Sequence, residues 1–538
     1  MGELALQGVS AAPGVASGGA VVLDRARRRD SSTVPAARRA DEAKRAHEAL
    51  VAVAGDLERI AAELRDAGRP EEAEIVETGV LMALDPELTA RVEALVTQNG
   101  LDACGALEQA TEQAALELAQ LADMMLSQRA DDVRSIGRRA AARLSGVEQL
   151  AADAILVAGT LGPADVAELA PKVRGIALAG GGVTAHAAIV ARSLGLPMVV
   201  GLGGRLLEIE DGEEVVVDGD GGAVVRRPDA TRVARAKADA KRTASARELA
   251  LSRREESART TDGRTIRVLG NASTVAEVRE AMAQGAEGVG LLRSELLFLE
   301  ATAWPRIEEQ VSAMRPVLEM LHGLTATVRL FDFGGDKTPP FLAGTSKRGI
   351  HLLLDHPERL RAHVAAILEA GSGTRLRLLV PMVDSPEQLV RIRAMLGPSH
   401  AELGAMIETP EAAQAAEDIA SKCQFLSIGT NDLTQLVLGL DRERSNSAPV
   451  LDPRVLRLIA ATTRAGRAIG IPVDVCGEAA SDSSVMPILV GLGVDELSVA
   501  AARVGQVREW VRGLDYATTA KASGLLLRES RDTSRKRV

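Results

Sequence analysis

The chain has 538 residues, and 64 Lys or Arg against 74 Asp or Glu give a formal net charge of −10. With 46% hydrophobic and 26% charged residues, the length predicts a globular protein of more than two domains and excludes disordered and collagen-like classes. The negative charge and the few aromatic residues (five Phe, two Trp, one Tyr) argue against nucleic-acid binding, which selects basic patches and stacking platforms.

Targeting signals are missing from the sequence pattern. The start, MGELALQGVS, has no basic segment followed by a long apolar one, so no secretory signal is expected. The longest uncharged stretch, residues 176–191, is too short for a membrane span and contains three glycines. Three scattered cysteines (Cys104, Cys423 and Cys476) suit a reducing cytoplasm, where we expect the protein to lie.

The residue composition and apolar spacing change twice along the N-terminal half. Residues 8–23 are Gly-rich and strand-like, residues 34–144 carry apolar residues at helical spacing, and residues 151–227 return to short Val- and Gly-rich strands. We therefore predict one α/β domain in two segments, 1–33 and 146–227, with a helical bundle, 34–145, inserted between them. The charged, glycine-free segment 228–260 is predicted to be a connecting helix.

Residues 261–538 alternate eight short apolar runs with helix-like segments. Such alternation predicts a parallel sheet, and eight units in this length predict a closed (β/α)₈ barrel. The fold class expected for the whole chain is therefore α/β and multidomain. The eight runs begin at Thr265, Gly285, Ala326, Arg375, Glu402, Cys423, Ile471 and Val494.

Polar residues cluster where these runs end, which is where barrel enzymes place their active sites. Buried charges are costly without partners, so several together predict an ion or an anionic ligand. The alternative, that they are ordinary loop residues, stays open at this point. The cluster contains Arg293, Arg329, Asp332, Glu408, Asn431, Asp432, Cys476 and Glu478.

A second candidate site is the loop GGGVTAHAAIVARSLGLPMVVG, residues 180–201. Glycines allow close backbone approach to a ligand, and His186 precedes a predicted helix start, where free N–H groups favour a phosphoryl group. A neutral imidazole can act as a nucleophile. Taken alone, His186 could equally be a satisfied core histidine.

This loop resembles the phosphohistidine signature of the phosphoenolpyruvate (PEP)-utilising enzyme family. GVGLLRSELLF, VRLFDFGGDK, MIETPEA, SIGTNDLTQ and DVCGE resemble the barrel motifs of that family, in the same order. Over nearly its full length, the chain is similar to the phosphoenolpyruvate–protein phosphotransferases, the enzyme I family of the bacterial sugar phosphotransferase system.

The resemblance implies roles for named residues. His186 corresponds to the phosphohistidine nucleophile and Cys476 to the acid that protonates the pyruvate enolate, although a small buried hydrophobe is the alternative for Cys476. Glu408 and Asp432 correspond to Mg²⁺ ligands, and hard carboxylate oxygens suit that ion. The remaining residues would contact substrate: Arg293, Arg329, Asn431, Arg442, Arg348 and, with an ordinary loop lysine as an equal alternative, Lys337.

The implied reaction transfers the phosphoryl group of PEP to His186, releases pyruvate, and passes the group to a histidine of the small carrier protein HPr. In the family the helical insert docks HPr and the barrel forms a homodimer. Four positions depart from the family pattern: Val183 and Ala185 in the histidine loop, His351 in the substrate loop, and Gly79 in the helical insert.

Two other functions remain open. A pyruvate phosphate dikinase or PEP synthase would need a large ATP-binding module, and the N-terminal region is instead an Ala-rich helical insert. A regulatory paralogue that signals by its phosphorylation state is suggested by three of the departures, Val183, Ala185 and His351. The nucleophile, both metal ligands and Cys476 are intact, which argues against that reading.

Overall fold

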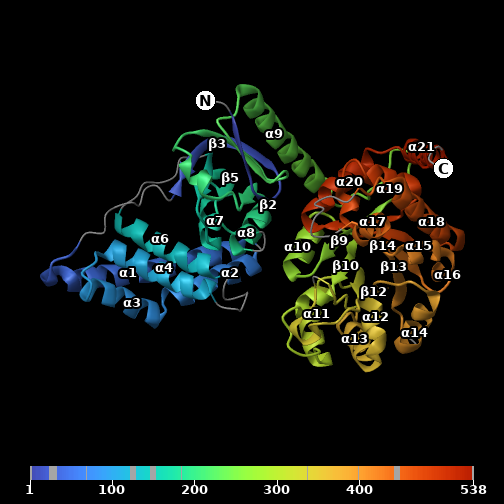
Figure 1. The fold of residues 1–538 in the computed structure, drawn as a ribbon, viewed down its shortest axis with the longest axis horizontal. Coiled ribbons are helices and arrows are strands. Elements are labelled where there is room, and N and C mark those ends of the chain that lie inside the picture. The colour runs from blue at the N-terminus through green and yellow to red at the C-terminus, as the bar shows by residue number, and fades with distance from the viewer. Residues whose placement is uncertain are drawn as a thin grey trace. The chain divides into compact units, whose positions relative to one another are not determined.

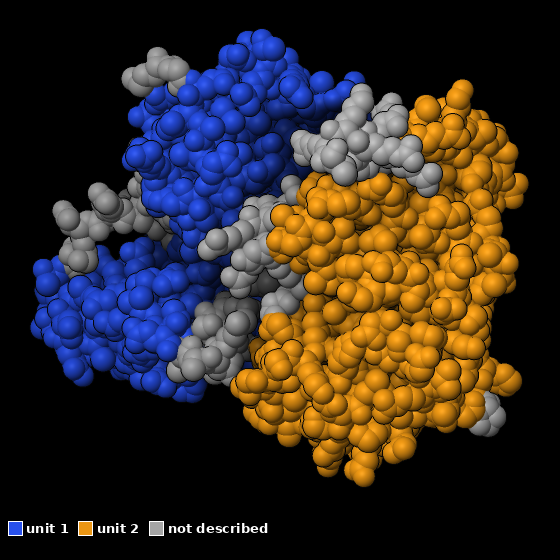
Figure 2. Space-filling view, turned by 45° about the vertical axis from the view of Figure 1, so that its right-hand side comes forward, with its two compact units in different colours: residues 1–245 blue, residues 246–538 orange. Residues whose placement is uncertain are grey.

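The computed structural model describes residues 3–23, 33–67, 69–120, 129–145, 153–182, 185–335, 337–397, 399–440 and 449–535. The chain forms two units, residues 1–245 and 246–538, which are coloured separately in Figure 2. The elements of each unit are labelled in Figure 1.

The first unit is built on an eight-stranded mixed sheet. The central strands β3, β4, β5 and β6 are parallel to one another, and β7 and β2 join antiparallel to β3 and β6. The strand-like segments predicted at both ends of this region therefore belong to one sheet. Across the sheet the order is β1 (Leu4–Gln7), β8 (Ala223–Arg226), β7 (Glu214–Asp218), β3 (Val15–Val22), β4 (Ala154–Ala158), β5 (Val173–Leu178), β6 (Met198–Val200) and β2 (Val9–Ala12).

Both faces of this sheet are buried. In β4, Leu156 and Ala158 pack against α7 (Pro163–Leu169) and α8 (His186–Leu194), whereas Ile155 and Val157 pack on the opposite face beside Leu206. A strand buried on both faces needs apolar residues at every position, which explains the uninterrupted run AILVA.

A helical group follows β3 and precedes β4 in the chain, although these two strands are paired neighbours. Its core is Ala-, Leu- and Val-rich and shares Ala164 of α7, so the helices pack against the sheet domain through α7. Small alanine side chains let the helices approach closely. The helices are α1 (Arg39–Asp66), α2 (Pro70–Ala83), α3 (Pro86–Thr97), α4 (Ala103–Ala119) and α6 (Ala130–Ser145).

Within the charged segment 228–260, residues Ala230–Ser252 form helix α9. Most of its side chains are exposed, as its charged sequence suggests. The boundary between the two units falls within this helix, between Ser245 and Ala246.

The second unit contains a closed barrel of eight parallel strands, which confirms the predicted fold class. Each of the eight apolar runs contributes one strand. In chain order the strands are β9 (Arg267–Ala272), β10 (Gly288–Arg293), β11 (Thr325–Arg329), β12 (Arg375–Val380), β13 (Glu402–Ile407), β14 (Phe425–Ile428), β15 (Val473–Val475) and β16 (Glu496–Ala500).

Helices surround the barrel and start at recognisable caps. Thr274 and Glu277 form a capping box at α10, and Asp452 caps α18, which ends at Gly470 in the left-handed conformation. The longer helices are α10 (Val275–Ala283), α11 (Ile307–Glu319), α12 (Gly349–Asp355), α13 (Pro357–Ala370), α14 (Pro386–Leu396), α17 (Thr430–Leu438), α18 (Pro453–Ile469), α19 (Met486–Leu492), α20 (Val504–Arg512) and α21 (Tyr516–Arg535).

The barrel interior is layered. Alternate strand residues face outward into one large apolar core beneath the helices. The inward-facing residues include an apolar cluster of Leu291, Leu379, Met406, Phe425 and Cys476. Among the residues that the structure describes, no helix has the length and apolar character needed to cross a membrane.

Candidate active site

The carboxyl ends of the barrel strands carry the predicted site residues. Arg293 and Arg329 are the last residues of β10 and β11, Glu408 follows β13, and Cys476 follows β15. Asp432 lies in the first turn of α17, directly after β14. Because all strands are parallel, these side chains gather at one end of the barrel.

Arg329 is buried among acidic partners. Its guanidinium donates to Glu295 and lies 3.3 Å from Asp332 Oδ2. Burial alone would lower the pKa of Arg329, but these two carboxylates raise it above its ordinary value. Lys337 Nζ reaches the same pair, at 3.2 Å from Glu295 Oε1 and 3.6 Å from Asp332 Oδ2. Arg329 is thus a fully charged group fixed in position by buried ion pairs.

Arg348 joins two parts of the site. Its guanidinium donates to both oxygens of Asp332 at 2.9 and 2.8 Å, and to both oxygens of Asp432 at 3.2 and 3.0 Å. Burial would lower the pKa of Arg348, and the two carboxylates raise it instead. Arg348, which corresponds to the substrate loop of the family, therefore lies next to the predicted metal ligand Asp432.

Glu408 is buried beside two other carboxylates. Its Oε1 accepts a hydrogen bond of 2.7 Å from the backbone N–H of Met382. Burial, followed by repulsion from Asp332 and Asp432, raises the pKa of Glu408 to about 8. A carboxyl group in such a place would be stabilised in its charged form by a bound cation.

The donor set fits a magnesium ion that retains water or substrate ligands. Within the described residues, no group of three or more His, Cys, Asp or Glu side chains could hold a metal. Glu408 and Asp432 are two carboxylates whose charges act on each other. Mg²⁺ is commonly bound by one or two carboxylates together with substrate oxygens and waters, so two are sufficient.

The remaining predicted contacts are placed differently. Arg293 is partly exposed and has no hydrogen-bond or ion-pair partner among the described residues. Asn431 Oδ1 accepts from the backbone N–H of Glu478 at 3.1 Å, which links α17 to the segment after β15. Arg442 lies outside the described residues.

Cys476 lies at the bottom of this cluster, within the apolar layer of the barrel. Only 4% of the residue is exposed. Burial and then the nearby Asp474 carboxyl raise the pKa of the Cys476 thiol to about 12. The thiol therefore carries its proton at neutral pH, as a general acid must.

His186 is the first residue of α8 in the other unit and is described within that unit alone. Its Nδ1 lies 3.3 Å from Asp132 Oδ2 of α6, and the Asp132 carboxylate is also 3.0 Å from Arg129 Nη1. The Nδ1 side of the ring therefore faces a carboxylate, although Nδ1 makes no hydrogen bond within the part of the chain that the structure describes.

Three departures can be located. Ala185 is the N-cap of α8 and provides no side-chain hydrogen bond. His351 Nε2 lies 3.2 Å from Asp384 on the barrel surface. Gly79 lies in α2, where an added Cβ would come within 3.2 Å of Leu57. Val183 lies outside the described residues.

Two further residues, Glu295 and Asn271, belong to the site but were not predicted from the sequence. Glu295 is fully buried and holds both Arg329 and Lys337. The sequence feature that could have indicated Glu295 is a single acidic residue within the apolar segment that follows β10. Asn271, at the end of β9, donates to the backbone carbonyl of Cys476 at 3.2 Å, and no sequence pattern distinguished it.

Three family models match the chain in sequence order. Residues 7–129 match "PEP-utilising enzyme, N-terminal", residues 150–222 match "PEP-utilising enzyme, mobile domain", and residues 247–516 match "PEP-utilising enzyme, PEP-binding domain". The last match covers the barrel with all its site residues, and the second contains His186.

Curated relatives agree with these matches. The chain is 37% identical to the multiphosphoryl transfer proteins of Rhodobacter capsulatus and Xanthomonas campestris, with 85% and 95% of this chain aligned. The alignments span only 58% and 64% of those longer proteins. The phosphoenolpyruvate-protein phosphotransferase of Streptomyces coelicolor is 36% identical, over 97% of this chain and 96% of that protein.

Proposed function

This chain belongs to the PEP-utilising enzyme family, and on that premise we propose that it is a phosphoenolpyruvate–protein phosphotransferase. It would move the phosphoryl group of PEP to His186 and then to a histidine of the carrier protein HPr, with release of pyruvate. This reaction would be the first step of sugar uptake by the phosphotransferase system.

The observation that carries the proposal is the cluster at the carboxyl end of the barrel. It combines fixed cations, of which Arg329 is the most buried, with two carboxylates suited to a metal and the protonated thiol of Cys476. These are the groups needed to bind a phosphorylated enol acid, stabilise its phosphoryl group and protonate its carbon.

Substrate binding would rely on the arginines. Arg293 has a guanidinium without a partner among the described residues, Arg329 has a preorganised one, and guanidinium groups match phosphate oxygens in a bidentate manner. Asn431 and Arg442 would contact further substrate oxygens, and Lys337 would hold the phosphate region together through Glu295.

Glu408 and Asp432 would hold Mg²⁺. When bound, the ion would neutralise charge that develops on the phosphoryl oxygens. Both oxygens of Asp432 accept from Arg348, and each keeps a lone pair that could face a cation, so Arg348 would lie next to the metal site.

His186 would attack phosphorus through Nε2, because its Nδ1 faces the Asp132 carboxylate. The negative charge of Asp132 would favour a proton on Nδ1, which would keep Nε2 unprotonated. After transfer, the enolate of pyruvate would take a proton at carbon from Cys476.

Partners follow from the same proposal. The helical group around α1 to α6 would dock HPr, because His186 borders it through Asp132 of α6. The barrel would form a homodimer, and the reaction would take place in the cytoplasm. Gly79 and Ala185 are the positions where carrier recognition would differ from that of other family members.

The deciding experiment incubates the full chain with ³²P-labelled PEP and Mg²⁺, with and without purified HPr. We expect acid-labile ³²P on the chain without HPr, and we expect this label to move to HPr when HPr is added. Label that stays on the chain would instead select the regulatory paralogue. A requirement for ATP would select the dikinase.

A further inference from the structure

The structure also indicates how Cys476 recovers its proton after each turnover, an inference that rests on the proposed role of Cys476. We propose that Asp474 supplies this proton through the hydroxyl group of Ser427. Asp474 and Ser427 lie inside the barrel, on neighbouring strands, on the side of Cys476 away from the substrate end.

The three side chains are neighbours inside the barrel. Ser427 Oγ donates to Asp474 Oδ2 at 2.6 Å. The Ser427 side chain also lowers the pKa of the nearby Cys476 thiol, and the thiol itself donates to the backbone carbonyl of Ile428 at 3.8 Å. The register explains this geometry, because Ser427 of β14 pairs with Asp474 of β15, and residues 474 and 476 point to the same side of their strand. The Ser427 hydroxyl is therefore bonded to the acid and lies on the same inner face of the barrel as the thiol.

Burial and the Glu496 carboxylate favour the protonated form of Asp474 and outweigh Ser427, Ser498 and Arg377, which favour the charged form. Facing it are Glu496 and Ser498 from β16, Ser427 from β14 and, more weakly, the Arg377 guanidinium from β12. Burial and then repulsion from the Glu496 carboxylate raise the pKa of Asp474 to about 7. A buried acid that holds a proton near neutral pH can give it to a thiolate, whose proton affinity is far higher.

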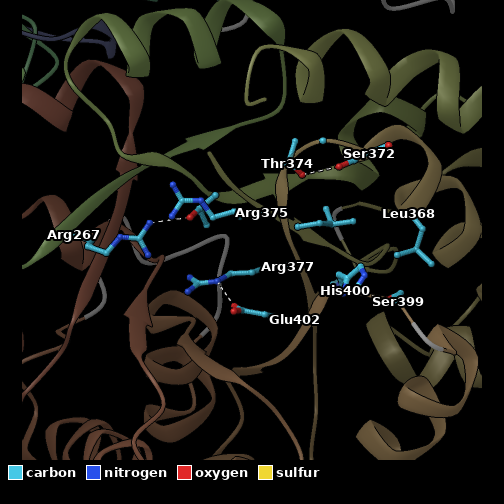
Figure 3. A pocket seen from close by; sticks show the side chains of 14 residues that line it. Arg267, Leu368, Ser372, Thr374, Arg375, Arg377, Ser399, His400 and Glu402 are labelled. Carbon is cyan, nitrogen blue, oxygen red and sulfur yellow. Dashed lines mark hydrogen bonds and ion pairs between the residues drawn. The ribbon is translucent and has the colours of Figure 1, made fainter. Parts of the chain in front are cut away.

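Asp474 also lies near a route to solvent. A cavity of about 650 Å³ opens at the amino ends of the strands, opposite the proposed active site, and is lined by Arg267, Arg377 and Glu402 (Figure 3). Arg377 pairs with both Glu402 and Glu496, at 2.8 and 2.7 Å. Water in this cavity thus reaches the ion pairs that border Asp474.

The proton balance is complete. Cys476 gives its proton to the carbon of the enolate and becomes a thiolate. Ser427 passes its hydroxyl proton to sulfur and takes the carboxyl proton of Asp474, so the negative charge moves from sulfur to the carboxylate. Asp474, which is buried and does not itself line the cavity, then takes a proton from a hydronium ion that enters from the cavity side, which leaves water, and the site returns to its starting state.

The test separates the first turnover from later ones. Rapid-quench measurements follow pyruvate formation from PEP, with HPr as acceptor, in the parent, Asp474→Asn and Ser427→Ala. Every protein starts with a protonated thiol, so we expect an unchanged first turnover and an unchanged KM for PEP. The steady-state rate should fall about 10²-fold in both variants, because general-acid steps contribute at this scale.

A matched control and a pH profile separate the relay from a structural role. Ser498 Oγ donates to the other oxygen of the same carboxyl group, at 2.9 Å, so Ser498→Ala disturbs Asp474 without interrupting the path to sulfur. We expect Ser498→Ala to behave as the parent. The parent's steady-state rate should decline above pH of about 7, as Asp474 loses its proton, and Asp474→Asn should lack this decline.

The outcomes are distinguishable. A normal steady-state rate in Asp474→Asn, or an equal loss in its first turnover, would overturn the relay. Cys476→Ala is measured beside it: a full rate of pyruvate formation there would remove the proton-donor role itself, whatever Asp474→Asn does.

Discussion

Two arginines at neighbouring strand ends are held in different ways. Arg329 is buried and compensated by Glu295 and Asp332, whereas Arg293 is partly exposed and has no partner among the residues that the structure describes. Removing Arg329 would leave buried carboxylates without their cation, which destabilises the fold. Removing Arg293 would only remove a group that is free to bind substrate, so Arg293 is the cleaner probe of the proposed phosphate contact.

Arg293→Gln should lower kcat/KM for PEP by about 10- to 100-fold, because a hydrogen bond between charged groups contributes about 1.5–3 kcal/mol. The unfolding temperature should stay the same. Arg361→Gln, at an exposed position of α13, is the matched control and should leave both quantities unchanged. Unaltered kcat/KM in Arg293→Gln would show that this guanidinium does not contact the substrate.

The sequence predicted site residues that lie within recognisable motifs, but not residues whose role depends on a contact with a distant part of the chain. The barrel residues from Arg293 to Cys476 were predicted because each lies at or just after the end of an apolar run. Glu295 and Asp474 were missed because their importance depends on what faces them: Arg329 for one, Ser427 for the other. Contacts between distant strands cannot be read from one sequence without the barrel register.

At the level of elements, strands and their order were predictable because the patterns are strong. Strand β4, which is buried on both faces, is an uninterrupted apolar run, whereas the barrel strands are short apolar runs that polar residues such as Arg377, Ser427 and Asp474 interrupt. Strand ends were less predictable. The run after Ala326 continues to Phe333, but β11 ends at Arg329, because Phe331 and Phe333 stack on each other in an aromatic cluster outside the strand.

The first unit depends on a buried ion-pair network that connects α6 with α7. Asp165 of α7 accepts from Ser135 and is paired with Arg138 and Arg139, at 3.1 and 2.8 Å. Burial would raise the pKa of Asp165, but the two arginines lower it below its ordinary value. A lowered pKa means that the pair stabilises the fold fully above the unfolded pKa, near 3.8, and progressively less as the pH falls below it.

Asp165→Ala should therefore destabilise the first unit by about 3–5 kcal/mol at neutral pH, because it leaves arginines without their buried partner. Hydrogen exchange of the full chain should report this loss in α6 and α7. The difference from the parent should shrink as the pH falls below about 4. Asp153→Asn removes the charge of an exposed pair with Arg174, and Asn tolerates the positive φ of this residue, so it is the control, in which exchange should not change. Equal exchange in both variants would contradict the network's role.

At the level of the whole molecule, the proposed reaction requires two units with different roles. His186 belongs to residues 1–245, and the substrate cluster belongs to residues 246–538. The proposed nucleophile therefore belongs to one unit and the proposed substrate-binding groups belong to the other, and α9 connects the two units along the chain. The barrel should be needed when the phosphoryl group comes from PEP, and the first unit should suffice when it comes from a carrier.

The most direct measurement of this division labels the full chain from two donors, ³²P-PEP and ³²P-labelled phospho-HPr, and maps the label by mass spectrometry. Both donors should label His186 in the parent, and neither should label His186→Ala. Glu408→Gln should accept label from phospho-HPr but not from PEP. Label on His186→Ala, or equal labelling of Glu408→Gln by both donors, would contradict transfer from the barrel to His186.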